Sequence, residues 1–84
     1  MNSVSLTGVT IGPSELREIE SGWLLCFEVR VEDDRPTVPI SYRLRDRDDL
    51  QELAAGTHVL IVGSLRHHSR LFVAAREIAL LADG

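Results

Sequence analysis

In Trp23-Leu24-Leu25-Cys26-Phe27-Glu28-Val29-Arg30-Val31, every odd-numbered position carries an apolar side chain, and charged side chains occupy the even positions from Glu28 onward. Successive side chains leave a strand on opposite faces. This period of two therefore predicts a strand over residues 23–31, with one face on a core and the other exposed. Residues 23–31 give the clearest strand signal in the chain, so the strands before and after them are placed relative to this one.

The run over residues 37–47 repeats this alternation, with its apolar side chains on the even positions. Its other face carries a row of arginines: Arg43, Arg45 and Arg47. The connection at 33–36, Asp-Asp-Arg-Pro, is short and rich in turn-forming residues, so the two runs are expected to pair as an antiparallel hairpin. Glu28 would then lie beside Ser41 or Arg43, depending on the register.

Three further stretches show strand signals on either side of this hairpin. Residues 2–11 predict a first strand, continued after a Gly-Pro-Ser turn by a short strand or extension over 15–20. Residues 57–65 are apolar on both faces, which is typical of a central strand or of a subunit contact. Residues 71–81 predict the last strand. The turn before it is polar and cationic, with Arg66, His67, His68 and Arg70.

A short helix is expected between the third and fourth of these strands, over residues 49–55. Asp46 or Asp48 can cap its N-terminus, and Gly56 can end it. Two turns of helix are not stable alone, so its apolar side would cover the end of a sheet. Five strands with a helix after the third predict an all-β, five-stranded OB-fold barrel. A small α+β sandwich is the alternative architecture.

Length and composition limit the class of protein. The 84 residues suit one domain, residues 1–84, and leave no room for a second core. The 44% apolar and 26% charged residues are ordinary for a soluble globular protein. The lone Cys26 excludes an internal disulfide, and neither a signal peptide nor a membrane span is evident. We therefore expect a cytoplasmic protein without membrane association.

The arginines cluster although the net charge of the chain is −4. A row of positive charges along one strand face indicates a polyanion lying on the sheet. The alternative is a solvated face whose arginines pair with carboxylates such as Glu28 and Glu32, because surface ion pairs are common. The overall acidity argues against a strong non-specific nucleic-acid binder, whose affinity comes mainly from phosphate neutralisation. Binding is expected to be local and sensitive to salt.

Patterns that predict catalysis or metal binding are missing. His67 and His68 could combine with His58 or Cys26, but neither HxxxH nor CxxC spacing is present. Nucleophile-elbow, phosphate-loop and dinucleotide-binding sequences are also missing. The sequence therefore predicts a protein that is not an enzyme, with no catalytic residue, no metal and no cofactor.

Several segments resemble, in order, parts of the bacterial single-stranded DNA-binding protein family. Residues 2–8, Asn-Ser-Val-Ser-Leu-Thr-Gly, look like its opening strand, and residues 13–17 followed by Ser-Gly at 21–22 look like its first turn. Residues 50–66 resemble its helix, glycine turn and fourth strand, and residues 73–81 resemble its closing strand. The short primosomal replication proteins that share the OB fold are about as similar.

The resemblance implies an OB domain that holds single-stranded DNA by base stacking and backbone contacts, in DNA replication, repair or recombination. It also implies a homodimer or higher homo-oligomer. The first strand, residues 2–11, is the expected pairing surface, because an open strand edge invites another edge. Phosphates need cations, and bases need aromatic faces. The residues expected to contact DNA are Arg43, Arg45, Arg47, Arg66, His67, His68, Arg70, Arg30, Trp23 and Tyr42.

Aromatic side chains are scarce, and Trp23, Phe27 and Tyr42 fall on apolar faces, where core packing is the alternative role. Aligning the arginine strand without gaps puts Ser41 and Arg47 where the family carries stacking aromatics. Each lost stack removes about 1–3 kcal/mol. DNA binding is therefore expected to be weak or assisted by a partner, with replication or primosome proteins as candidates. The alternative function is a dimeric OB-fold adaptor for protein interactions that has lost DNA binding.

Overall fold

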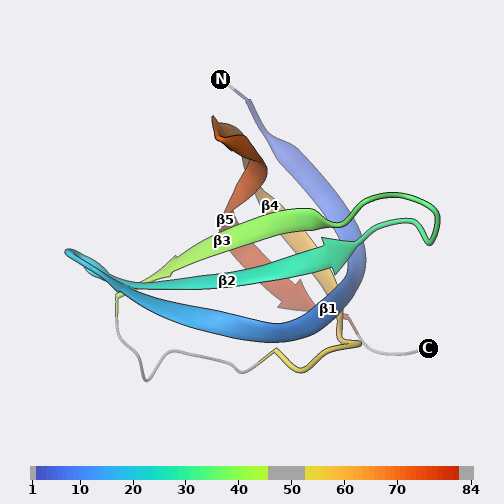
Figure 1. Cartoon of the computed structure of the whole chain (residues 1–84), viewed down its shortest axis with the longest axis horizontal. Coiled ribbons are helices and arrows are strands. Elements are labelled where there is room, and N and C mark those ends of the chain that lie inside the picture. Colours follow the sequence, from blue (N-terminus) through green and yellow to red (C-terminus); the bar gives the residue numbers. More distant parts are fainter. Residues whose placement is uncertain (1, 46–52, 82–84) are drawn as a thin grey trace.

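Five strands close into a barrel in the computed structural model of the chain, which describes residues 2–45 and 53–81 (Figure 1). The strands follow the order β1-β2-β3-β5-β4 around the barrel. Neighbouring strands are antiparallel except β3 and β5, which pair in parallel through residues 40–42 and 73–75. The strands are β1 (Val4–Ile19), β2 (Gly22–Arg30), β3 (Val38–Leu44), β4 (His58–His68) and β5 (Arg70–Leu80).

Strand β1 is long enough to belong to both sides of the barrel. Residues 4–9 pair with β4, and residues 9–11 and 15–19 pair with β2, with a register shift between Ile11 and Glu15. Gly12, in the left-handed region at φ 70°, lies within this shift. The Gly-Pro-Ser turn expected here is thus a bulge that bends one continuous strand, since an extra residue sharpens the local curvature. The expected extension over 15–20 belongs to the same strand.

The β2–β3 hairpin forms as the alternation predicts. Its register places Cys26 opposite Ser41 and Leu24 opposite Arg43. Glu28 lies opposite Pro39 instead of opposite Ser41 or Arg43, and its carboxylate accepts a hydrogen bond from the Thr37 hydroxyl at 3.0 Å. The main neighbour of Glu28 within the hairpin is therefore a hydroxyl and not the arginine row.

The core contains the inward side chains of all five strands and of the loop before β4. Its buried members share an apolar, mostly branched character and are Leu25, Phe27, Val29, Ile40, Leu44, Leu53, Val59, Ile61 and Val73. Trp23 and Tyr42 are half-buried and pack against this cluster. The closed all-β barrel excludes the α+β sandwich.

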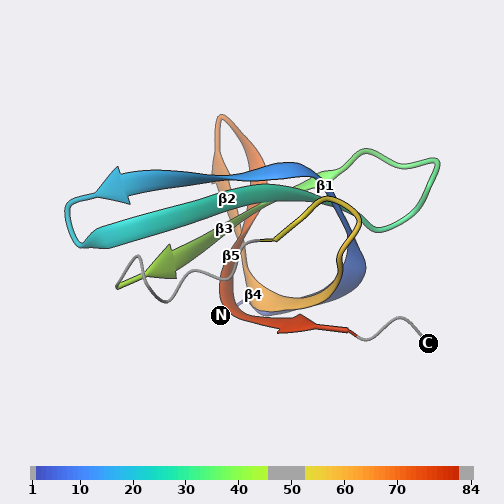
Figure 2. The same cartoon turned by 90° about the horizontal axis from the view of Figure 1, so that it is seen from below.

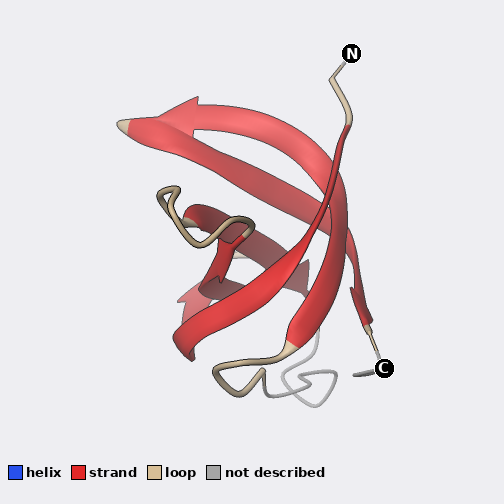
Figure 3. Cartoon of the chain, turned by 90° about the vertical axis from the view of Figure 1, so that its right-hand side faces the viewer, coloured by secondary structure: helices blue, strands red, loops and turns tan. Residues whose placement is uncertain are grey.

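The predicted helix over residues 49–55 is wrong. The described part of the chain contains no helix, and residues 53–55 are irregular backbone leading into a turn at 55–56 (Figure 3). The first residues of that prediction and its proposed caps, Asp46 and Asp48, lie outside the described residues. An all-β barrel with five strands is what the structure supports.

Hydrogen bonds to Thr10 fix the conformation of residues 53–57. The Thr10 hydroxyl donates a hydrogen bond to the Ala54 carbonyl at 2.7 Å and accepts one from the Thr57 amide at 3.0 Å. The Thr10 backbone amide donates to the Thr57 carbonyl at 2.9 Å, and its carbonyl accepts from the Gly56 amide at 2.8 Å. These bonds to β1 hold the loop across the lower end of the barrel, where Leu53 is buried (Figure 2).

Candidate nucleic-acid interface

A groove of about 510 Å³ lies on the outer face of the barrel, over β3, β5 and β4, with Leu24 of β2 at its border. It is lined mainly by small and cationic side chains, with one aromatic ring. The lining residues are Leu24, Ser41, Arg43, Ser64, Arg66, Phe72, Ala74, Ala75 and Arg76. Because side chains alternate along a strand, Ser41 and Arg43 of β3 and Ser64 and Arg66 of β4 all reach this face.

The floor of the groove is a row of small side chains across three strands. Ser41 of β3 is in register with Ala74 of β5, which is in register with Ser64 of β4. Because none of these side chains extends beyond a hydroxyl or a methyl group, a ligand can approach the sheet closely here. Two hydroxyls also give the floor hydrogen-bond donors and acceptors.

Strand direction determines which residues form each wall. Since β3 and β5 are parallel, Arg43 and Arg76, each two residues beyond the floor, lie on the same side of it. Since β4 is antiparallel to β5, Arg66 lies on the other side, directly opposite Phe72. One wall therefore carries two guanidinium groups, and the other carries one guanidinium group beside an aromatic ring.

A register shift between β4 and β5 places Arg76 in the wall of the groove. Arg76 lies at the register shift between Val62 and Gly63 of β4, where it has no residue directly opposite. Its Nη2 donates a long hydrogen bond to the Ser3 hydroxyl at 3.4 Å.

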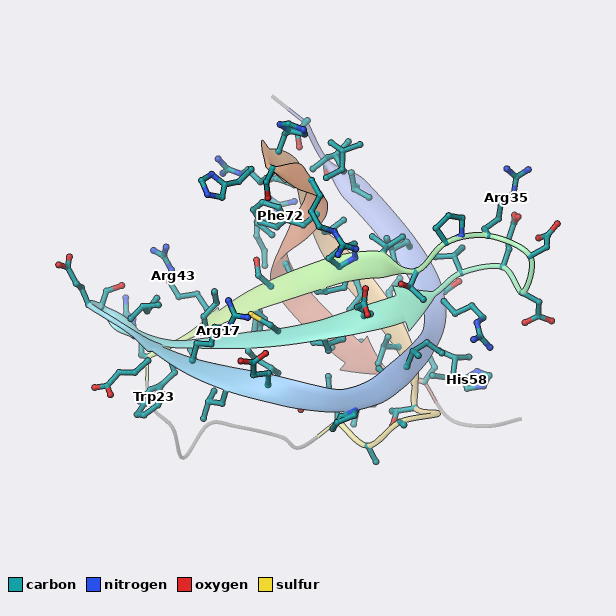
Figure 4. The ribbon with its side chains drawn as sticks, viewed as in Figure 1. Arg17, Trp23, Arg35, Arg43, His58 and Phe72 are labelled. Carbon is teal, nitrogen blue, oxygen red and sulfur yellow. The ribbon has the colours of Figure 1, made fainter. Side chains whose placement is uncertain are left out.

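Phe72 is half-buried, and Figure 4 shows it on the same side of the barrel as Arg43, near the tip of the β4–β5 hairpin. Arg35 lies far from both, in the loop between β2 and β3 (Figure 4).

Carboxylates pair with arginines outside the groove. Glu15 forms an ion pair with Arg17 at 3.2 Å, and Glu28 forms one with Arg70 at 3.4 Å. The hydrogen bond to Glu15 raises the pKa of the Arg17 guanidinium, which is already fully charged. Among the described residues, no carboxylate pairs with an arginine of the groove walls. The carboxylates of the described residues therefore leave the positive charge of the walls uncompensated.

The structure separates the residues expected to contact DNA into distinct groups. Arg43 and Arg66 line the groove. His68 and Arg70 continue the face of Arg66 and Phe72 toward the hairpin tip, while His67, opposite Leu71, points to the other face. Arg30 and Arg45 are exposed outside the groove, and Arg47 lies outside the described residues. Trp23 and Tyr42 belong to the inward set and pack against the core.

Phe72 and Arg76 line the groove but are absent from the sequence-based expectation. A signal for them exists in the sequence, because Arg70, Phe72, Ala74 and Arg76 alternate along one face of the last strand. The aromatic ring and both guanidinium groups on that face mark it as polar and outward, like the face of Arg43.

Among the described residues, the side chains that could bind a metal ion do not cluster. Burial raises the pKa of the Cys26 thiol, which lies beside Ser41 in the sheet, so it stays protonated at neutral pH. The described residues contain no group of three or more His, Cys, Asp or Glu side chains placed to hold a metal ion. They also contain no helix that could cross a membrane.

Comparison with solved structures identifies the architecture. The barrel matches the dimeric structure of the N-terminal domain of PriB protein from Thermoanaerobacter tencongensis, with a TM-score of 0.76 and 29% sequence identity over 98% of each chain. The chain is an OB-fold barrel similar to this PriB domain. No protein-family model matches the sequence, and no curated protein does. This match supports the expected OB fold and the likeness to short primosomal replication proteins.

Proposed function

We propose that this PriB-like barrel binds single-stranded DNA in the cytoplasm, in DNA replication, repair or recombination, and is not an enzyme. The observation that carries the proposal is the outer groove, in which Arg43, Arg66 and Arg76 surround a floor of small residues with Phe72 beside it. Phosphates need cations and bases need an aromatic face, and this groove offers both within one surface.

The chemistry of the groove favours weak binding. A base stacked on an aromatic side chain contributes about 1–3 kcal/mol, and Phe72 is the one aromatic residue among those that line the groove. The remaining contribution comes from phosphate neutralisation, which falls as salt rises. The chain therefore binds DNA weakly or with help from a partner, for which replication or primosome proteins are candidates.

We further propose that the chain works as a homodimer. The PriB domain that it resembles has a dimeric structure. In the sheet, residues 4–8 of β1 pair with β4 along one edge, while the pairing of β1 with β2 begins only at Val9. In the described part of the chain no strand pairs with the other edge of residues 4–8, and this supports β1 as the edge on which a second copy pairs.

Fluorescence anisotropy with labelled oligo-dT at low salt tests the DNA-binding proposal. Replacing Arg43 and Arg66 by glutamate is expected to abolish binding, because both charges reverse at the groove walls. Arg35→Glu is the control, since Arg35 lies in the distant β2–β3 loop, where it pairs with Glu32 at 3.5 Å. No binding by the natural chain at tens of micromolar protein, or equal loss in the control, would refute the proposal.

A protein-interaction adaptor is the second candidate function. The net charge of −4 and the exposed Leu65 and Leu71 side chains on the β4–β5 hairpin favour it. Salt separates the two candidates, since affinity for a single strand falls with a slope of about −0.7 per phosphate on logarithmic axes. Capture of a replication protein by the nuclease-treated chain, combined with no oligonucleotide binding, would favour the adaptor.

A further inference from the structure

Two ion pairs, Glu15 with Arg17 at 3.2 Å and Glu28 with Arg70 at 3.4 Å, border the groove on the side of β1 and β2. Glu15 continues the floor row of the groove across the sheet, because it is in register with Cys26, which is in register with Ser41. Glu28 lies opposite Pro39 on the adjoining outward row. A phosphate that passed Leu24 and left the groove over β2 would meet arginines whose charge these carboxylates already compensate, so it would gain little attraction there.

The strands beneath the groove set the length of chain that it can hold. The floor runs from β3 through β5 to β4, which is two strand spacings, or about 10 Å. Each strand of double-stranded DNA advances about 3.4 Å per nucleotide, and a single strand that keeps its bases stacked has the same spacing. About three nucleotides therefore cross the floor between β3 and β4.

The groove also limits the number of stacked bases. Phe72 is the single aromatic side chain in its lining. Trp23 and Tyr42 pack against the core instead. Arg43 and Arg66 are diagonally opposite across the floor, so a strand that crosses it passes a cation on entering and another on leaving.

We propose that the groove is a short-footprint site, which takes about three nucleotides of single-stranded DNA across the strands and stacks one base on Phe72. The inference rests on the proposed DNA-binding function and deepens it. Arg43, Arg66 and Arg76 contact the phosphates, and the hydroxyls of Ser41 and Ser64 face the segment between them. Beyond the groove, the carboxylates of Glu15 and Glu28 compensate Arg17 and Arg70, so the strand gains little by continuing over β2 and β1.

Isothermal titration calorimetry with unlabelled oligo-dT of two to eight nucleotides tests the footprint. Affinity is expected to rise steeply up to about three or four nucleotides. From four to eight nucleotides it rises only about threefold, because the longer strand offers more registers for the same contacts. The salt slope stays near −2 for both lengths, the value for about three phosphates. A tenfold or greater rise in affinity from four to eight nucleotides, or a slope that grows with length, overturns the inference.

Substitutions test the single stacked base. Phe72→Ala is expected to weaken binding of the four-nucleotide strand by tenfold or more while leaving the salt slope unchanged, because stacking contributes no counterion release. Leu71→Ala is the matched control, since Leu71 is the adjacent residue on the other face of β5 and is 57% exposed. Equal effects of the two substitutions count against Phe72 as the stacking residue. Circular dichroism checks that both variants fold.

The two proposals fail in different ways. If no oligonucleotide of any length binds at low salt, the DNA-binding function itself is refuted. If long strands bind well but strands of four nucleotides do not, DNA binding stands and the short footprint is refuted.

Discussion

Arginines of this chain differ in whether a carboxylate lies beside the guanidinium group. Arg17 and Arg70 each lie within 3.4 Å of a glutamate carboxylate, whereas Arg43 and Arg66 face small side chains and Phe72 across the groove. An exposed ion pair contributes at most about 1 kcal/mol to stability, yet it lowers the positive potential that a phosphate meets. The charge of the groove is therefore set by where the carboxylates lie as well as by the number of arginines.

Glu28→Gln is expected to raise the affinity for oligo-dT about two- to fivefold at low salt, the equivalent of about 0.5–1 kcal/mol. The substitution keeps the shape of the side chain, removes a negative charge beside the groove and frees Arg70 from its carboxylate partner. Anisotropy titrations measure the effect.

Glu32→Gln is the control for this prediction. Glu32 pairs with Arg35 in the β2–β3 loop, so its neutralisation makes the same change in net charge away from the groove. An equal gain in both variants would mean that net charge, and not the local contact to Arg70, determines binding.

At the residue scale, the period of two predicted which faces the arginines occupy. It placed Arg43 outward and Tyr42 inward, which the burial of the two side chains confirms. It did not predict that Glu28 would lie opposite Pro39, because the register of a hairpin depends on the geometry of its loop. Nor does alternation along single strands reveal that β5 lies beside β3, which brings Phe72 and Arg76 to the site.

At the scale of the elements, the strands were predictable and the segment before β4 was not. Leu53 points inward as an amphipathic helix would require, and it is buried. The conformation of residues 53–57, however, depends on hydrogen bonds to Thr10, more than forty residues earlier in the sequence. Local propensity is a weak guide where distant backbone groups supply the partners.

Thr10→Val is expected to reduce the free energy of unfolding by about 1–3 kcal/mol. Valine has nearly the same shape, but it leaves the Thr57 amide without its acceptor beside a side chain that is 1% exposed. Urea denaturation followed by circular dichroism measures the change. Thr7→Val, on the exposed face of the same strand, is the control and is expected to change stability by no more than about 0.5 kcal/mol. Equal stability of the two variants would contradict the role of the Thr10 hydroxyl.

The bulge between β4 and β5 depends on Gly63. A Cβ atom at this position would collide with the Ala74 carbonyl oxygen and the Ala75 Cα, both of which are backbone atoms and cannot rotate away. Gly63→Ala is therefore expected to lower the free energy of unfolding by about 1–3 kcal/mol, the cost of overpacking.

Urea denaturation measures this loss, with Ser64→Ala as the control. Ser64 is the next residue, and its side chain faces the open groove, so its truncation is expected to change stability by no more than about 0.5 kcal/mol. If Gly63→Ala unfolds at the same urea concentration as the natural chain, the close approach of β4 and β5 is not a constraint on this position.

At the scale of the whole molecule, barrel closure leaves two kinds of surface with different uses. Within residues 2–45 and 53–81, no carboxylate pairs with the arginines of the groove over β3, β5 and β4, and residues 4–8 of β1 pair with a strand along one edge only. The two surfaces adjoin at Ser3, whose hydroxyl accepts a hydrogen bond from the groove residue Arg76 at 3.4 Å. A small chain also gains stability from association, because 84 residues bury only a modest fraction of their surface.

Sedimentation equilibrium is expected to give a mass of twice 9.3 kDa for the natural chain. Replacing Ser5 and Thr7 by glutamate is expected to shift the equilibrium to monomer. Both side chains are exposed in a single copy, so the fold tolerates the charges, but a two-fold axis through paired β1 edges would bring like charges together. Arg35→Glu changes the net charge by the same two units away from this edge and is expected to stay dimeric. A monomeric natural chain at high micromolar concentration, or an unchanged dimer in the Ser5 and Thr7 variant, would mean that β1 is not the subunit contact.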